Sequence, residues 1–300
     1  MTCGMEKHGL SVPMHLGVLL VPDPSHGFRI HSRVSTDQTG PRNGHRQMKH
    51  LLDAHRSDAR KIQLIEPCSR LIRYLKSKND ILLLTTSNRY EEHTWDIPKT
   101  TQLALRIKDH LKQEERRVTL LDVAKLKIYT CEGNISGKRG NNCGVPEAKL
   151  RDHGKNPTGQ HRCWASINNK DDQLYKVSRE LLRSQAVVFF VSVRWGQTNS
   201  LYQRLFERLS WIENKVSTLG EAPIPQLKKL EAGIVLFGHN WNDEQVLKTQ
   251  KQNFKWFGWK TPAALSFNWQ YTKDAEEESP ESYLDAIEEF GALLQVGLPR

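Results

Sequence analysis

The sequence predicts an α/β fold, a three-layer α/β/α sandwich around a five-stranded parallel sheet. Five short apolar runs are spaced along residues 81–267. Most of them are followed by a segment whose apolar residues recur every three or four positions, as on one face of a helix. Strands that alternate with helices are joined by right-handed crossovers, which place the strands parallel in one sheet.

The first two predicted strands are Ile81–Leu84 and Val118–Leu121, and both are short continuous apolar runs. A strand that is buried on both faces of a parallel sheet has this composition. Between the two runs, Leu103, Ile107 and Leu111 recur at intervals of four residues. This spacing predicts a helix that turns one face towards the core.

Three further strands are predicted at Ala186–Val191, Gly233–Gly238 and Ala264–Phe267. The first of these has the strongest β-type composition in the chain. Helical periodicity lies before, between and after them. The apolar positions of the predicted helices are Leu174, Val177 and Leu181, then Leu201, Leu205, Leu209, Ile212 and Val216, then Leu247, Phe254 and Phe257, and finally Tyr283, Ile287, Phe290 and Leu294.

The composition changes near residue 78. The 300-residue chain has a formal net charge of +10, and residues 1–77 contribute +6 of it with twelve Lys or Arg and six Asp or Glu. Residues 22–44 are rich in small and polar types, which do not bury enough surface to offset the cost of ordering them. We therefore expect 1–77 to be a basic, disordered or weakly helical extension. Residues 78–300 are expected to form the folded domain, with an insertion at 125–170.

Several classes of protein are disfavoured. No apolar run approaches the length of about 20 residues that a membrane-spanning helix needs. Residues 78–300 carry only the remaining +4 of charge, so nucleic acid is not the expected partner. Five cysteines without a C-x-x-C pair predict a reducing, cytoplasmic environment. The spacing C-x11-C-x17-H-x-C in the insertion does not fit a zinc site, so no metal is expected.

In an open parallel sheet, ligands bind beyond the carboxyl ends of the strands, so function is expected from the loops there. The loop after the first strand contains Thr85–Arg89, and Lys99–Thr101 open the next helix. Hydroxyl groups near a helix N-terminus favour a phosphate. The alternative is that the threonines only cap the helix. A dinucleotide fingerprint and a P-loop are both absent from the sequence.

The loops after the third and fourth strands are Ser192–Ser200 and Gly238–Asp243. Each combines glycine, tryptophan and side-chain amides, which suit a flat heteroaromatic ligand with a polar edge. The alternative for the first of them is a surface loop in which Trp195 packs on the sheet.

From about Lys78 to Gln295 the residues resemble the flavodoxin-like flavoproteins, in particular the NAD(P)H-dependent FMN reductases and quinone reductases. The segments that carry the resemblance are Ile81–Arg89, Val187–Gly196 with Asn199 and the following helix, and Ile234–Gly238. The resemblance implies the strand order 2-1-3-4-5 and a bound FMN.

The resemblance also implies roles for individual residues. The FMN phosphate would be faced by Thr86, Ser87, Arg89, Thr100 and Thr101. The isoalloxazine ring would be lined by Val193, Arg194, Trp195 and Gly196, with Gly238, His239 and Asn240 at its far edge. Arg194 would stabilise the reduced flavin. The insertion at 125–170 is not part of the resemblance, and we expect it to pack over the flavin with Trp164 covering the acceptor. The chain departs from the group in its long spacing from Ser87 to Thr100, which contains Glu91 and Glu92, and in the insertion.

The activity that the resemblance implies is an FMN-dependent NAD(P)H oxidoreductase. Hydride would pass from NAD(P)H through the flavin to a flavin, quinone or similar small-molecule acceptor, by a ping-pong mechanism. One alternative is a flavodoxin-type electron carrier without pyridine-nucleotide activity, although such carriers are usually small and acidic. Another is a flavin-free module that binds nucleic acid through residues 1–77. Members of this group are often dimers, so a homodimer is one of the oligomeric states expected for this chain.

Overall fold

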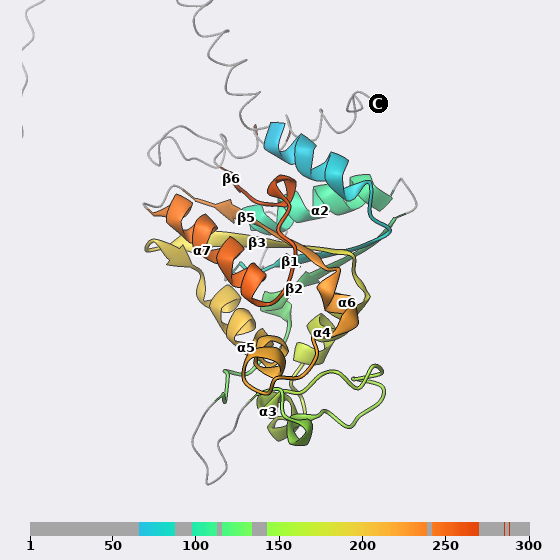
Figure 1. Cartoon of the computed structure of the whole chain (residues 1–300). Helices are drawn as coiled ribbons and strands as arrows, with labels where there is room; N and C mark the ends of the chain where they lie inside the picture. The colour runs from blue at the N-terminus through green and yellow to red at the C-terminus, as the bar shows by residue number, and fades with distance from the viewer. Residues whose placement is uncertain are drawn as a thin grey trace, which may run out of the picture. The chain divides into compact units, whose positions relative to one another are not determined.

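A parallel sheet forms the centre of the structure, with helices on both of its faces (Figure 1). The computed structural model describes residues 66–87, 98–112, 116–133, 143–238 and 242–269, together with Asp285 and Glu288. All of them belong to one unit, His50–Arg300. The α/β sandwich predicted from the sequence is therefore confirmed. The predicted C-terminal helix lies outside the described residues, except that Asp285 and Glu288 are helical.

The parallel strands pair in the order β2-β1-β3-β5-β6. Their bounds are β1 Asp80–Thr85, β2 Arg117–Asp122, β3 Ala186–Arg194, β5 Glu231–Phe237 and β6 Phe267–Trp269. In the centre of the sheet, Leu83 of β1 is in register with Leu120 of β2 and with Val188 of β3. Along β1, β3 and β5, side chains on both faces of the sheet are buried, as the continuous apolar runs predict.

The strand order is not identical to the predicted one, because the sequence did not reveal β4 Gln197–Thr198. This strand pairs antiparallel with the end of β3. Two residues are too few to produce a periodic pattern in the sequence. The last strand is also shifted: Ala263–Leu265 form a 3-10 turn, and β6 begins only at Phe267.

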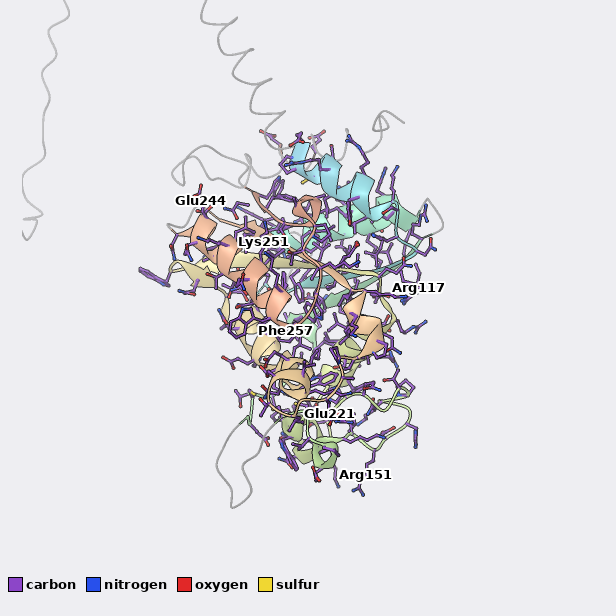
Figure 2. All side chains as sticks on the ribbon, in the orientation of Figure 1. Arg117, Arg151, Glu221, Glu244, Lys251 and Phe257 are labelled. Atoms are coloured by element: carbon purple, nitrogen blue, oxygen red, sulfur yellow. The ribbon has the colours of Figure 1, made fainter. Side chains whose placement is uncertain are left out.

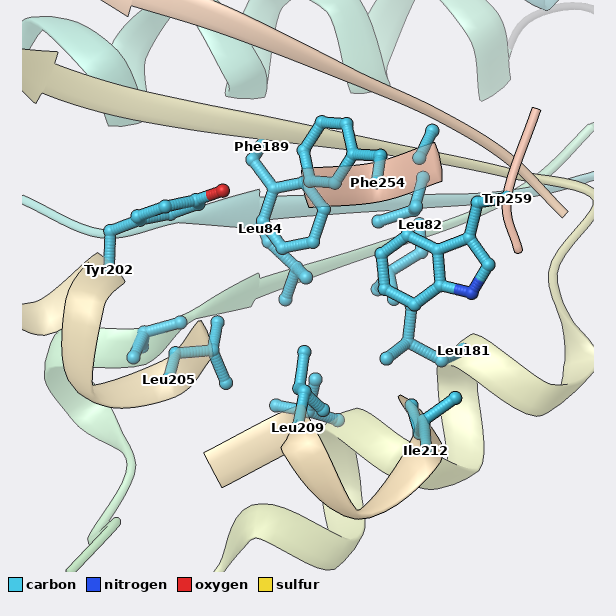
Figure 3. Packing of buried hydrophobic residues seen from close by; sticks show 14 of the residues in the cluster. Leu82, Leu84, Leu181, Phe189, Tyr202, Leu205, Leu209, Ile212, Phe254 and Trp259 are labelled. Atoms are coloured by element: carbon cyan, nitrogen blue, oxygen red, sulfur yellow. The ribbon is translucent and has the colours of Figure 1, made fainter. Parts of the chain in front are cut away.

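Two hydrophobic cores lie on opposite faces of the sheet. On one face Leu82, Leu84 and Phe189 pack against α4 Leu174–Arg183, α5 Ser200–Ser217 and α7 Asp243–Trp256 (Figure 3). The rings of Phe189 and Phe254 are stacked with centroids 5.3 Å apart, and Tyr202 meets Phe189 edge-on at 5.6 Å. Such aromatic pairs add about 1 kcal/mol each beyond their burial.

On the other face, Ile81, Leu83 and Phe190 pack against α2 Lys99–Lys112 and a helix over residues 66–75. Cys68, Leu71, Ile72 and Leu75 of that helix are fully buried. The domain boundary expected between residues 77 and 78 thus separates this helix from the sheet face that it covers. The apolar spacing of the helix resembles that of any amphipathic segment, so the sequence did not show that it joins the core.

At residue 233 a glycine is required because the backbone of the 3-10 turn lies directly against β5. A Cβ atom there would lie 2.0 Å from the carbonyl oxygen of Leu265. Any other residue would push the turn away from the sheet.

The described residues of the insertion after β2, 125–133 and 143–170, pack beside α4 and α5. The 3-10 turn Val123–Lys125 leads into the insertion, which contains the short helices Pro146–Ala148 and α3 Trp164–Asn168. Arg162 of the insertion bonds to both carboxylate oxygens of Glu221, at 2.8 and 2.9 Å; Glu221 lies just beyond the end of α5 and is labelled in Figure 2. The insertion therefore forms an outer layer on the helices, with α3 at the far side of α5 from the sheet (Figure 1).

Candidate functional site

The carboxyl ends of β1, β3 and β5 meet at one edge of the sheet. The loops predicted to carry function follow these three strands. β1 ends at Thr85, β3 at Arg194 and β5 at Phe237. Because neighbouring parallel strands end side by side, the structure brings the three loops together at this carboxyl edge.

Thr86 links the end of β1 to β3 and to α5. Its backbone N–H and its hydroxyl lie 3.2 and 3.3 Å from the carbonyl oxygen of Phe190. Asn199 donates from Nδ2 to the Thr86 hydroxyl at 3.2 Å. Thr86 is fully buried, so its polar groups are engaged within the protein rather than turned towards a phosphate.

Asn199 caps α5 and organises this edge. Its Oδ1 accepts from the backbone N–H of Tyr202 at 3.0 Å, and its Nδ2 also reaches the hydroxyl of Ser192 at 3.1 Å. Asn199 was not among the site residues predicted from the sequence. An asparagine directly before a helical stripe is an N-cap signal that could have indicated this role.

Three buried hydroxyls lie where β1 ends and α2 begins. Thr100 and Thr101, in the first turn of α2, are 3% and 4% exposed, and Thr85 is fully buried. Thr85 follows Ile81 and Leu83 in the strand alternation, so its side chain lies on the face that α2 covers. Among the described residues none of the three hydroxyls has a hydrogen-bond partner.

Unpaired buried hydroxyls cost about 1–3 kcal/mol each, so a group that fills their hydrogen-bonding capacity is favoured here. The first turn of a helix adds unpaired backbone N–H groups and a partial positive charge. A phosphate monoester supplies acceptor oxygens and negative charge. The residues present therefore fit the phosphate end of FMN. Ser87 lies beside them after β1, whereas Arg89 lies outside the described residues.

The hairpin between β3 and β4 turns at Trp195 and Gly196. Both residues have positive φ angles, 49° and 66°. Arg194 is opposite Gln197 across this two-residue turn. Turns of this kind favour Asn or Gly at both positions because a Cβ is strained there. Trp195 is nevertheless 87% exposed, so core packing does not explain its presence.

The neighbours of Trp195 differ in exposure. Arg194 is exposed, and Val193 is only 1% exposed. Since alternate residues of a strand point to opposite faces, Val193 packs into the core while Arg194 points to solvent. The structure thus leaves Arg194 and Trp195 exposed to a ligand, whereas Gly196 and Val193 are buried.

The loop after β5 meets this hairpin. Gly238 has a φ of 114°, and Asn242 adopts a left-handed conformation with a φ of 74°. Asn242 donates from Nδ2 to the carbonyl oxygen of Gly196 at 3.1 Å. This bond joins the second and third predicted loops. His239 and Asn240 lie outside the described residues.

The structure does not bring Trp164 to this edge. It opens α3, directly after Cys163, whose sulfur lies 3.4 Å from Nε of Arg208. Arg208 is nine residues beyond Asn199 along α5, about 13 Å at the rise of an α-helix. The sequence placed Trp164 near the acceptor only because it belongs to an insertion of unknown course.

A buried ion pair anchors the insertion to α5. Two guanidinium nitrogens of Arg208 lie 2.9 Å from the two carboxylate oxygens of Asp172, and both side chains are fully buried. Burial raises the pKa of Asp172, but the bonds from Arg208 outweigh it and hold that pKa below its usual value. His161 contacts the hydroxyls of Ser178 and Ser166 at 2.7 and 2.9 Å. Burial, together with the charge of Arg208, lowers the pKa of His161 to about 3.

The buried polar group at this part of the insertion therefore consists of the neutral His161 beside Arg208, which is ion-paired with Asp172. Within the residues that the structure describes, no three His, Cys, Asp or Glu side chains are arranged to hold a metal ion. None of the helices in that same part of the chain is long and apolar enough to cross a membrane.

No family model matches the sequence, and no curated protein matches it. Solved structures of similar fold exist at low sequence identity. RosB with its bound intermediate 8-demethyl-8-formylriboflavin-5'-phosphate has a TM-score of 0.45 and 13% identity over 72% of this chain and 79% of that chain. An azoreductase from Bacillus anthracis has a TM-score of 0.40 and 14% identity over 73% of this chain and 100% of its own.

A third such structure is the apo form of the NADH:FMN oxidoreductase EMOB. Its TM-score is 0.38, with 13% identity over 71% of this chain and 89% of that chain. At these identities the likeness concerns the arrangement of the backbone alone.

Proposed function

We propose that this chain is an FMN-dependent NAD(P)H oxidoreductase that reduces a small-molecule acceptor such as a flavin or a quinone. The observation that carries the proposal is the group of buried hydroxyls without partners, Thr85, Thr100 and Thr101, at the junction of β1 and α2. This group lies at the edge of the sheet where proteins of this topology bind their ligands. The hydroxyls and the first turn of α2 would hold the phosphate of FMN.

Two further features support a flavin rather than a simple anion. Trp195 offers an exposed aromatic face, and Arg194 offers a positive charge beside it. Gly238, which is partly exposed, lacks a side chain that would keep a planar ring at a distance. A bound flavin would supply the hydride chemistry between NAD(P)H and the acceptor, and the residues of this chain would supply position and electrostatics.

Each side chain then has a separate task. Arg194 would sit at the pyrimidine edge of the ring and stabilise the negative charge of the reduced form. Asn242 holds the Gly196 carbonyl and keeps the hairpin against the loop after β5. Asn199 and Thr86 fix the ends of β1 and β3, so the two halves of the site keep a constant separation.

Thr100→Val tests this proposal because its two effects have opposite signs. Valine has the shape of threonine without the hydroxyl. Removal of a buried hydroxyl without a partner should leave the apoprotein as stable as before or more stable. Loss of a donor to the phosphate should weaken FMN binding by about 1–2 kcal/mol, roughly five- to thirty-fold.

The affinity is measured by titrating apoprotein with FMN and following the quenching of flavin fluorescence. Thr249→Val is the matched control, because Thr249 is an exposed threonine within α7. Unchanged FMN affinity in Thr100→Val would remove α2 from the site. Protein that binds FMN but is not reduced by NADH or NADPH would instead be an electron carrier of the flavodoxin type.

A further inference from the structure

Three cysteines of the described chain gather around Arg208. Cys163 accepts from Nε of Arg208 at 3.4 Å. Cys131 accepts from the backbone N–H of Gly133 at 3.3 Å. A Cβ atom on Gly133 would lie 3.1 Å from the sulfur of Cys131 and 3.6 Å from that of Cys143. Both sulfurs therefore lie against the same glycine, which lets them approach each other.

The three cysteines differ in their access to solvent. Cys131 is half-buried, while Cys143 is 3% exposed and Cys163 is 2% exposed. A small reagent from solvent can reach Cys131 first. Cys143 lies behind it, in the core between the insertion and α5. This is the arrangement of an attacking thiol with a resolving thiol at its back.

A fixed positive charge lies close to these sulfurs. Arg208 is held by Asp172, and it also donates to the carbonyl oxygen of Tyr129 at 2.7 Å. The contact from the Cys143 thiol lowers the pKa of Cys131 to about 6, and the Gly133 N–H and the charge of Arg208 act in the same direction. Burial and the carboxylate of Glu207 oppose them. At neutral pH a larger fraction of Cys131 than of an ordinary cysteine is then thiolate, the nucleophilic form of cysteine.

We propose that Cys131 is a site of oxidation by hydroperoxides and that Cys143 converts the product into an intramolecular disulfide. In the first step the Cys131 thiolate attacks a peroxide oxygen. The S–O bond forms, the O–O bond breaks, and hydroxide or an alkoxide leaves and takes up a proton. In the second step Cys143 loses its proton and attacks the sulfur of Cys131. The S–S bond forms and water leaves, so the two thiols lose the two electrons that reduce the peroxide.

The second step is prepared by the first. The contact with the Cys131 thiolate raises the pKa of Cys143 above its ordinary value, with burial adding to the effect. Once Cys131 is a neutral sulfenic acid, that negative charge is gone and the Cys143 proton is lost more readily. Cys163 is the less suitable partner because its sulfur does not lie against Gly133, where the sulfurs of Cys131 and Cys143 meet.

This site is separate from the proposed flavin site, because Arg208 and Asn199 are nine residues apart on α5. The test is made on the full chain without flavin or NAD(P)H, so its outcome does not depend on the proposed function. Reduced protein is treated with hydrogen peroxide, alkylated and digested with trypsin without reductant. Lys138 and Arg139 lie between the two cysteines, so trypsin places them in different peptides.

We expect mass spectrometry to show the Cys131 and Cys143 peptides joined by a disulfide, and separated again by reductant. In Cys143→Ser the sulfenic acid should persist on Cys131 and be trapped by dimedone. Cys68→Ser is the control, since Cys68 is fully buried and its pKa is raised by that burial. It should leave the disulfide unchanged.

A second measurement on the unmodified protein covers the case in which Cys143→Ser fails to fold. The rate of Cys131 alkylation by iodoacetamide should reach half its maximum near pH 6, compared with about 8.5 for an ordinary cysteine. An ordinary pH profile at Cys131 would overturn the proposal. A disulfide that joins any other pair, or peroxide consumption without loss of the Cys131 thiol, would also overturn it.

Discussion

The amide nitrogen of Asn199 lies 3.2 Å from the hydroxyl of Thr86, although 113 residues separate them in the chain. This bond connects the loop after β1 to the first turn of α5. The other end of the same side chain caps α5 through Tyr202. One asparagine therefore fixes two of the loops that meet at the carboxyl edge of the sheet.

Replacement of Asn199 by alanine should destabilise the protein by about 1–3 kcal/mol. The helix cap is lost, and the buried hydroxyl of Thr86 loses a donor. Asn199→Asp should recover part of this loss, because it keeps the cap but not the donor. Urea unfolding of the three proteins gives the comparison. Equal midpoints for the alanine variant and the wild type would contradict the role of Asn199.

Trp195→Asn should stabilise the protein by about 1 kcal/mol. Trp195 has a φ of 49° in a two-residue hairpin, where Asn followed by Gly is the favoured pair. The same change should weaken FMN binding, because an aromatic face is lost. Trp256→Asn is the matched control, since Trp256 is 70% exposed but lies in α7 with no left-handed backbone. Equal or lower stability of Trp195→Asn in chemical unfolding would show that the turn is not strained.

Arg194→Ala should lower the midpoint potential of the bound flavin by tens of millivolts, because the reduced anion loses more stabilisation than the neutral oxidised ring. For a two-electron couple about 30 mV corresponds to about 1.4 kcal/mol. Arg194→Lys keeps the charge and should keep most of the potential. A spectroelectrochemical titration of the three proteins decides the matter, and identical midpoints would exclude Arg194 from the site.

The stability of the protein should fall as the pH drops from about 6.5 towards 3. His161 has a folded-state pKa of about 3, whereas an unfolded histidine titrates near 6.5. Below pH 6.5 the unfolded chain therefore binds a proton that the folded chain does not, which favours unfolding. The carboxylate of Asp172 adds a loss in the same direction at lower pH. Urea unfolding between pH 7 and 4 gives the unfolding free energy at each pH. This free energy should fall less steeply with decreasing pH in His161→Gln than in the wild type. An equally steep fall in both proteins would show that His161 is not the cause.

Leu71→Ala should cost about 2–5 kcal/mol of unfolding free energy, the usual range for a fully buried leucine. Leu71 precedes residue 78, where the composition changes, so a large loss assigns its helix to the folded domain. Val216→Ala, at a position that is 37% exposed, should change the stability by less than about 0.5 kcal/mol. A loss as small as that at Leu71 would mean that the helix is dispensable.

The sequence alone determined the parallel α/β architecture and the edge where a ligand would bind. Continuous apolar runs such as Ala186–Val191 satisfy only a strand that is covered on both faces, and alternation with helical stripes leaves few topologies. The three loops could be predicted for the same reason, because the carboxyl ends of neighbouring parallel strands share an edge.

Only the tertiary structure decided which polar groups at that edge are engaged. Thr86, Thr100 and Thr101 look alike in the sequence, yet the Thr86 hydroxyl is bonded to Phe190 and Asn199, while the other two have no partner in the described part of the chain. Whether such a hydroxyl finds a partner depends on segments that are distant in the sequence, and local spacing does not reveal them. The same holds for Cys131 and Cys143, because the backbone at Gly133 and the placement of Arg208 on α5 bring their sulfurs and a positive charge together.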